Sequence, residues 1–253
     1  MDRLNEFLED TKDYKLFSYE EYKSSSLELR LKKIQLLNEY YKLKYTELPK
    51  LQVFIDCDGV TLDTMSLAKR LLLINHGIDY DTRDRNDIIQ QEIISNFFKS
   101  LDWKKLLQAT DEINKSSKFI KLFQESTIYR PTIYTAVNSD KEKEEKTSHF
   151  STLLPIVDIK FVQAHTPKQC EDPNSVIIDD DNFNLVNWNG YPLHFDSAIP
   201  TIFPNIDDLG ELYYLFYRDP NNPTSFIHKY GLYDNLVKEE DSKTKKITWK
   251  KKI

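Results

Sequence analysis

Glycine and cysteine are scarce in this chain of 253 residues, which contains five Gly and two Cys. Two cysteines cannot form the disulfide framework of a small secreted domain, so we expect a cytoplasmic protein held together by a hydrophobic core. No run of about 18 apolar residues occurs, which argues against a membrane-spanning helix. The first residues also lack the basic start and apolar middle of a signal peptide.

Several binding signatures are missing as well. Neither Gly-x-Gly-x-x-Gly nor Gly-x4-Gly-Lys-(Ser/Thr) occurs, so the sequence does not support a dinucleotide fold or a P-loop. The five His residues show no metal-ligand spacing. The formal net charge is -6, which argues against a general nucleic-acid-binding surface but leaves room for a local basic patch.

What the chain does contain is alternating apolar and amphipathic segments. With 40% hydrophobic and 30% charged residues, it has the composition of a globular protein with one sizeable core and a smaller accessory unit. Strands that alternate with helices predict an α/β fold: a Rossmann-like parallel sheet flanked by helices. The segments predicted as strands are 51–56, 131–137, 157–162, 174–180 and 191–195, followed by a closing helix at 206–217.

The chain divides into four expected parts. Residues 1–48 form an N-terminal helical extension, 49–65 and 127–218 the catalytic core, 66–126 a helical cap, and 219–253 a charged, peripheral C-terminal tail. The cap is predicted because its segments 66–76, 86–99, 103–113 and 117–124 all have helical patterns.

The N-terminal extension has one apolar helix face, formed at spacings of three and four by Leu27, Leu31, Ile34, Leu37 and Tyr41. We expect this face to pack on its own domain, with a homodimer through the N-terminal helices as the alternative.

Acidic side chains follow two of the predicted strands. Asp56 and Asp58 come after the first strand, Asp179 and Asp180 end another, and Thr135 lies near the end of a third. In an open parallel sheet, ligands bind beyond the carboxyl ends of the strands, so these groups should converge. Converging carboxylates repel one another unless a cation compensates them, and Mg²⁺ prefers such oxygen ligands.

This arrangement has a definite chemistry. One carboxylate can attack a phosphoryl group and form an acyl-phosphate, while a second exchanges a proton with the leaving oxygen. Gly59 lets the chain turn sharply next to these acids and lets the backbone approach the phosphoryl group, so it is a candidate substrate-binding position.

The segment Asp56-Cys-Asp-Gly-Val-Thr-Leu-Asp63 resembles the first motif of the haloacid-dehalogenase (HAD) superfamily. The resemblance implies a HAD-like sheet with a helical cap after the first strand. It also implies that Asp56 is the nucleophile and that Asp58 is the general acid/base, which lends Mg²⁺ its backbone carbonyl. Cys57, between the two acids, is expected to pack away from them.

Two further motifs of the superfamily have counterparts. Thr135 resembles the second motif, which implies that Thr135 and Ala136 bind the phosphoryl oxygens. The run ending in Asp179 and Asp180 resembles the fourth motif, which implies that Asp180 is a direct Mg²⁺ ligand, together with Asp56 and Asp58, and that Asp179 supports it.

The third motif is a lysine that neutralises the phosphate and the nucleophile. Lys168 is our preferred candidate, because it follows a strand and lies 12 residues before Asp180. Lys141, Lys143 and Lys146 compete for the role, but their charged helix is predicted to be solvated.

Within the superfamily, the chain is most similar to the 5′(3′)-deoxyribonucleotidases, which have a cap between motifs one and two and a lysine shortly before an Ile-Asp-Asp motif. Their Thr-Ser-Pro is Thr135-Ala-Val here. The resemblance implies a Mg²⁺-dependent phosphomonoester hydrolase acting on a small molecule, a nucleotide in the first instance. The aromatic residues Phe97, Phe98 and Trp103 either stack on a base or pack inside the cap.

Two alternatives stay open at this point. One is a phosphatase of nucleic-acid ends or of a small non-nucleotide metabolite. The other is a binding or interaction protein that has kept the HAD fold and uses its N-terminal helices as the working surface.

Overall fold

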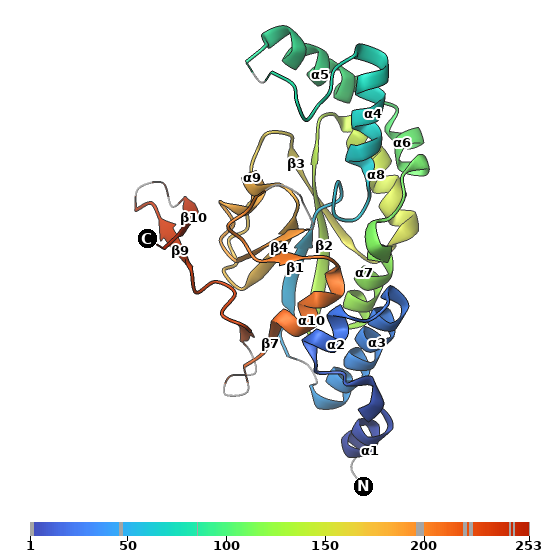
Figure 1. Ribbon diagram of the computed structural model, residues 1–253, viewed down its shortest axis with the longest axis vertical. Helices are drawn as coiled ribbons and strands as arrows, with labels where there is room; N and C mark the ends of the chain where they lie inside the picture. The colour runs from blue at the N-terminus through green and yellow to red at the C-terminus, as the bar shows by residue number, and fades with distance from the viewer. Residues whose placement is uncertain are drawn as a thin grey trace.

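A computed structural model describes residues 3–45, 48–84, 86–195, 200–219, 222, 225–242, 244 and 246–252. Its centre is a parallel sheet of six strands in the order β3-β2-β1-β4-β5-β6. The helices α7 (Ser116–Glu125) and α8 (Asp140–Leu153) lie on one side of this sheet and α9 (Asn182–Leu185) on the other (Figure 1). The predicted α/β, Rossmann-like architecture is therefore confirmed. The strands are β1 (Leu51–Ile55), β2 (Tyr129–Val137), β3 (Asp158–Gln163), β4 (Ser175–Asp179), β5 (Tyr191–Phe195) and β6 (Asn205–Ile206).

The middle strands are nearly continuous apolar runs because both of their faces are covered. All five residues of β4 are buried, and in β1 only Gln52 is partly exposed. β1 lies between β2 and β4, so the ends of these three strands are neighbours. The first five strands were predicted from the sequence, whereas the two-residue β6 is too short to leave a pattern.

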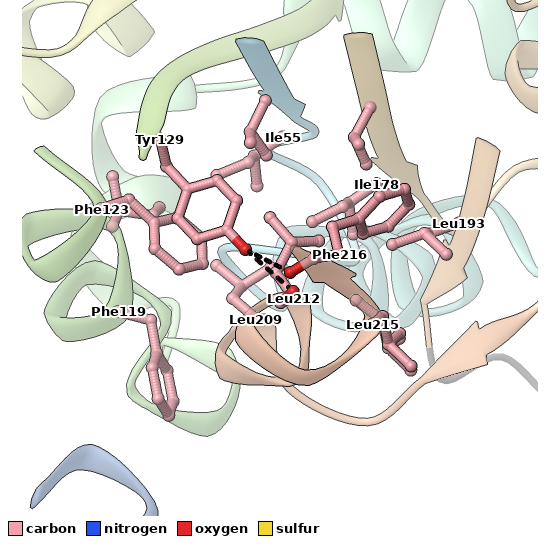
Figure 2. Packing of buried hydrophobic residues seen from close by; sticks show 14 of the residues in the cluster. Ile55, Phe119, Phe123, Tyr129, Ile178, Leu193, Leu209, Leu212, Leu215 and Phe216 are labelled. Carbon is pink, nitrogen blue, oxygen red and sulfur yellow. Dashed lines mark hydrogen bonds between the residues drawn. The ribbon is translucent and has the colours of Figure 1, made fainter. Parts of the chain in front are cut away.

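The main hydrophobic core lies between the sheet and a C-terminal segment. Figure 2 shows Ile55, Ile178 and Leu193 of the sheet near the segment 209–216. The hydroxyl of Tyr129 donates hydrogen bonds to the carbonyls of Leu212 (2.9 Å) and Phe216 (3.4 Å), drawn as dashed lines (Figure 2). These bonds tie β2 to the segment that closes the core.

The predicted closing helix at 206–217 is wrong over much of its length. The chain forms a short 3-10 turn, η3 (Leu209–Glu211), then one helical turn, α10 (Leu212–Leu215), and then a strand, β7 (Phe216–Arg218). The strand forms because β7 pairs in antiparallel register with β8 (Phe226–His228), which draws residues 216–218 out of a helical conformation.

A second, smaller core lies within the cap. It is formed by α4 (Thr64–His76), α5 (Ile88–Ser100) and α6 (Trp103–Ala109). In Figure 1, α4 and α5 lie at the end of the molecule opposite α1. The following helix α7 (Ser116–Glu125) contributes Phe119, Ile120 and Phe123 to the main core instead. The division between the two cores therefore falls before residue 126, where the sequence analysis placed the end of the cap.

The N-terminal segment is part of the main core. It contains α1 (Arg3–Asp10), η1 (Lys12–Tyr14), α2 (Tyr19–Lys23) and α3 (Leu27–Lys44). On α3, Ile34, Leu37 and Tyr41 are buried in the main cluster, and the Asn38 amide donates to the carbonyl of Leu122 at 2.7 Å. The homodimer stays a prediction, but most of the apolar face proposed for it is buried within the chain, and Leu27 and Leu31 are partly buried there.

A buried ion pair fixes this segment to η3. Arg30 lies 2.6 Å from Asp208, whose side chain is 1% exposed and also accepts a hydrogen bond from Tyr22.

We expect Arg30→Met to lower the free energy of unfolding by about 2 kcal/mol, because it leaves the buried carboxylate of Asp208 without its cation. Chemical denaturation would measure this. Lys12→Met, which removes only an exposed ion pair with Glu9, is the control and should change stability by less than about 0.5 kcal/mol. Equal effects of the two variants would contradict the prediction.

The tail is not wholly peripheral, contrary to the sequence analysis. It forms a hairpin of β9 (Leu236–Glu240) and β10 (Ile247–Lys251). Trp249 is buried, and its indole N–H donates to the carbonyl of Trp188 at 2.9 Å. The Tyr233 hydroxyl donates to the carbonyl of Pro192 at 3.0 Å. Because this segment is rich in charged residues, its few buried side chains do not form a recognisable apolar pattern in the sequence.

Among the described residues, no helix is both long and apolar enough to cross a membrane.

Candidate active site

The carboxyl ends of three neighbouring strands bring the predicted site residues together. Asp56 directly follows β1, and its N–H donates to the carbonyl of Ile178 in β4 at 3.0 Å. Thr135 lies near the end of β2 and is fully buried, and Asp179 ends β4. The convergence expected from the topology of a parallel sheet is present in the structure.

Lys168 joins two of the acids. Its Nζ lies 2.6 Å from Oδ1 of Asp56 and 2.7 Å from Oδ2 of Asp179, and its side chain is 1% exposed. Burial alone would lower the pKa of Lys168, but Asp179 and Asp56 more than offset this and raise it. Lys168 therefore stays charged and bridges Asp56 and Asp179.

Asp56 is a buried carboxylate surrounded by charge. Burial is the main cause that raises its pKa from 3.8 to about 7; Lys168 opposes this, while Asp179 and Asp58 add to it. Its Oδ1 accepts a hydrogen bond from the N–H of Cys57 at 2.7 Å. A carboxylate with so little solvent and so many acidic neighbours requires further positive charge to stay ionised.

Asp179 and Asp180 are adjacent in sequence but differ in their surroundings. Asp179 is satisfied: besides Lys168, it accepts from the Asn184 amide at 3.1 Å and from the N–H of Asp181 at 2.9 Å. Among the described residues, no side chain forms an ion pair with Asp180. Burial and the like charges of Asp179 and Asp56 raise the pKa of Asp180 to about 8.

This donor set fits Mg²⁺. Carboxylate oxygens of Asp56, Asp179 and Asp180 all lie within 4.8 Å of one another. Mg²⁺ takes oxygen ligands from one or two carboxylates and completes its shell with water and phosphate. Asn184 and Lys168 together engage both oxygens of Asp179, whereas Lys168 and the N–H of Cys57 engage only Oδ1 of Asp56. Asp56 and Asp180 are therefore the carboxylates with room for a cation.

Gly59 is close to Asp180. Its φ of +83° lies in the left-handed region, and a Cβ added there would be 2.2 Å from Oδ2 of Asp180. The turn is closed by the N–H of Gly59, which donates to the carbonyl of Leu62 at 2.9 Å. The sequence indicated the sharp turn but not the close approach to Asp180.

This contact leads to a paired prediction. We expect Gly59→Ala to weaken Mg²⁺ binding at least about 10-fold and to cost about 1–2 kcal/mol of stability, because the methyl group displaces Asp180 and the backbone is strained. Calorimetric titration with Mg²⁺ and thermal unfolding would measure both. Gly77→Ala is the control: its φ is +67° but its added Cβ meets nothing within 4 Å. It should lose stability and keep its Mg²⁺ affinity; a loss of affinity there too would contradict this explanation.

The second acid, Asp58, is held by a lysine that the sequence analysis set aside. The Nζ of Lys146 lies 2.6 Å from Oδ2 of Asp58, and Thr64 donates to Oδ1 at 2.5 Å. Burial would raise the pKa of Asp58, but Lys146 more than offsets it, so this pKa is lowered. Ala136, a predicted substrate-binding residue, directs its carbonyl to the Nζ of Lys146 at 3.0 Å.

The expectation of a solvated helix is wrong for Lys146, which is 0% exposed, and correct for Lys141 and Lys143. The helix is α8 (Asp140–Leu153), and its buried residues are Glu142, Lys146 and Phe150. These residues recur every four positions, so they share one face. The single apolar member, Phe150, was the sequence signal that this face is turned inward.

Cys57 and the cap aromatics behave as packing residues. Cys57 is fully buried in the main cluster, although its Sγ is 3.7 Å from Oδ1 of Asp58. Phe97, Phe98 and Trp103 are buried in the second core, where the indole N–H of Trp103 donates to the carbonyl of Phe98. Of the two alternatives stated for the aromatics, packing inside the cap describes them.

Two cavities lie away from these acids. One, of about 580 Å³, borders α4 and α5 near His76 and Asn96, and the other, of about 370 Å³, borders the N-terminal segment near Lys12 and Phe17. Neither is lined by a predicted site residue.

Comparisons with known proteins give little direct help. No protein-family model matches the sequence, and no curated protein matches it. Among solved structures, the chain is similar to a HAD-superfamily hydrolase, subfamily IA, variant 1, from Geobacter sulfurreducens PCA, with 8% sequence identity and a TM-score of 0.43. The match covers 65% of this chain and 98% of that one. Because the sequence identity and the TM-score are both low, this likeness carries no assignment of function.

Proposed function

We propose that this chain is a Mg²⁺-dependent phosphomonoester hydrolase of the HAD type that works through a phospho-aspartate on Asp56. The observation that carries the proposal is the meeting of a buried carboxylate, a second acid two residues later and a buried lysine at the ends of adjacent parallel strands. Structural ion pairs alone would not require a further acid beside them such as Asp180, which has no ion-pair partner in the part of the chain that the structure describes.

In the first step, one carboxylate oxygen of Asp56 attacks phosphorus, while Lys168 and the N–H of Cys57 hold the carboxylate in position. The bond from phosphorus to the leaving oxygen breaks, and the leaving oxygen takes the proton of Asp58. The substrate's phosphate dianion adds negative charge beside Asp58, which favours the protonated carboxyl that this step needs. In this proposal, Lys168 and Thr135 bind phosphoryl oxygens.

In the second step, water gives a proton to Asp58 and attacks phosphorus. The bond to Asp56 breaks, which releases inorganic phosphate and restores both carboxyl groups. Mg²⁺, when held by Asp56, Asp180 and the carbonyl of Asp58, supplies positive charge that compensates these acids and the phosphate. The cap would exclude bulk water from the reaction.

For the substrate, we propose a nucleoside monophosphate. Support comes from the order of the motifs, the insertion of the cap after β1 and the position of Lys168 before β4. Since Phe97, Phe98 and Trp103 are engaged in cap packing, recognition of a base would depend on other cap residues.

The test is release of inorganic phosphate from a panel of nucleoside monophosphates, sugar phosphates and a 3′-phosphorylated oligonucleotide, with Mg²⁺ and with chelator. We expect nucleotides to be the best substrates and chelator to abolish turnover. If nucleotides were the poorest of the panel, the substrate proposal would be abandoned while the phosphatase stands. If no phosphoester were hydrolysed with Mg²⁺ present, the alternative of an interaction protein would replace it.

A further inference from the structure

The ammonium group of Lys146 is surrounded by hydrogen-bond acceptors. Besides Asp58, its Nζ contacts Oε1 of Glu142 at 2.8 Å, Oγ1 of Thr135 at 3.0 Å and the carbonyl of Ala136 at 3.0 Å. The ring of Trp103, from the cap, covers it at 4.8 Å. An ammonium group has three N–H donors, so these four acceptors use all of them. The lysine therefore has one well-defined position.

Asp58 is in turn fixed by three elements. Lys146 on α8 and Thr135 on β2 hold its Oδ2, at 2.6 Å and 3.3 Å, and Thr64 at the start of α4 holds its Oδ1. On the other side of the lysine, Glu142 is anchored by the N–H of Asn138 at 2.7 Å. The chain from Glu142 through Lys146 to Asp58 is continuous; Glu142 and Lys146 are buried, and Asp58 is partly exposed toward the site.

The two buried lysines serve different acids. Lys168 contacts Asp56 and Asp179, whereas Lys146 contacts Asp58 and Glu142. A single lysine would suffice to neutralise the phosphoryl group. A second one, with no ion pair to the nucleophile, implies a separate task on the side where the leaving group departs.

We propose that Lys146 is a positioning residue for Asp58, and that it fixes the carboxyl group which gives its proton to the leaving oxygen, while Lys168 serves the nucleophile and the phosphoryl group. This inference rests on the proposed phosphatase function. The proton balance is that of the first step above: the leaving oxygen gains the proton that Asp58 loses, and water later returns one.

The consequence is a dependence on the leaving group. A weakly basic phenolate departs without much help, whereas a strongly basic one needs the proton in the transition state, and a well-placed general acid contributes about 100-fold or more. We expect Lys146→Met to reduce kcat/KM for the most basic leaving group about 100-fold, and for p-nitrophenyl phosphate less than about 5-fold.

The experiment measures kcat/KM, which reports phosphorylation of Asp56, for a series of substituted aryl phosphates with Mg²⁺. In Lys146→Met, the plot of log kcat/KM against leaving-group pKa should become steeper. In Lys168→Met, it should shift down without a change of slope. Lys143→Met, an exposed lysine on the same helix, should reproduce the wild type.

The single variant leaves two buried carboxylates without their lysine, so it can fail to fold. Lys146→Met combined with Glu142→Gln removes the excess charge, and this double variant should show the same steeper slope. Parallel plots for wild type and for these variants would overturn the inference, because a purely structural lysine lowers all rates alike. A wild-type protein that hydrolyses neither this series nor any phosphoester of the panel above would instead overturn the phosphatase function itself.

Discussion

Asp56→Asn is expected to lower Mg²⁺-dependent phosphate release at least about 1,000-fold, because an amide keeps the shape of the side chain but cannot form the acyl-phosphate. The fold should persist, since the substitution removes one negative charge from a buried cluster that includes Asp179 and Asp58. Initial rates of phosphate release by the purified variant would measure the loss. Acid quenching during turnover should trap a phosphoenzyme in the wild type and none in the variant.

Asp181→Asn is the matched control. Asp181 is exposed, lies one residue beyond Asp180 and caps α9 (Asn182–Leu185) by accepting from the N–H of Phe183. Asparagine caps a helix about equally well, so the control should keep both stability and activity. If Asp56→Asn retained more than a few per cent of the activity, the covalent mechanism would be refuted.

The sequence predicts the candidate site well where sheet topology dictates it. β1 and β4 are buried on both faces, which makes them apolar runs that end visibly in acids. Because parallel strands end at a common edge, the sequence alone predicts that Asp56 and Asp180 lie close together. Lys168 is predicted differently, from its resemblance to the third motif and its position 12 residues before Asp180.

The sequence predicts less where tertiary contacts decide. Lys146 lies on a helix with mostly exposed charges, and only its contacts with Asp58 and Glu142 make a buried lysine tolerable there. The tail reads as charged, yet Trp249 is buried against Trp188. Asp58 and Trp188 cannot be identified as these partners from local periodicity, because both are distant in sequence from the side chains that they contact.

Lys168→Met is expected to destabilise the protein by about 3–5 kcal/mol at neutral pH, because it leaves Asp56 and Asp179 buried without their common cation. It should also reduce activity, as the phosphoryl group loses its neutralising charge. Chemical denaturation without Mg²⁺ would measure the stability. Lys121→Met, an exposed lysine on α7, is the control and should change stability by less than about 0.5 kcal/mol.

The pH dependence separates charge from packing. The pKa of Asp56 in the folded protein is raised from 3.8 to about 7, so ionising it opposes folding as pH rises through this window. Removing Lys168 takes away the group that lowers this pKa, so the penalty in the variant grows with pH. The difference in free energy of unfolding between Lys168→Met and the wild type should therefore be large at pH 8. It should shrink toward pH 4, where Asp56 takes up a proton in both proteins. Added Mg²⁺ should also restore part of the stability, since it replaces the missing positive charge. A difference that is constant with pH would mean that lost packing, and not uncompensated charge, explains the effect.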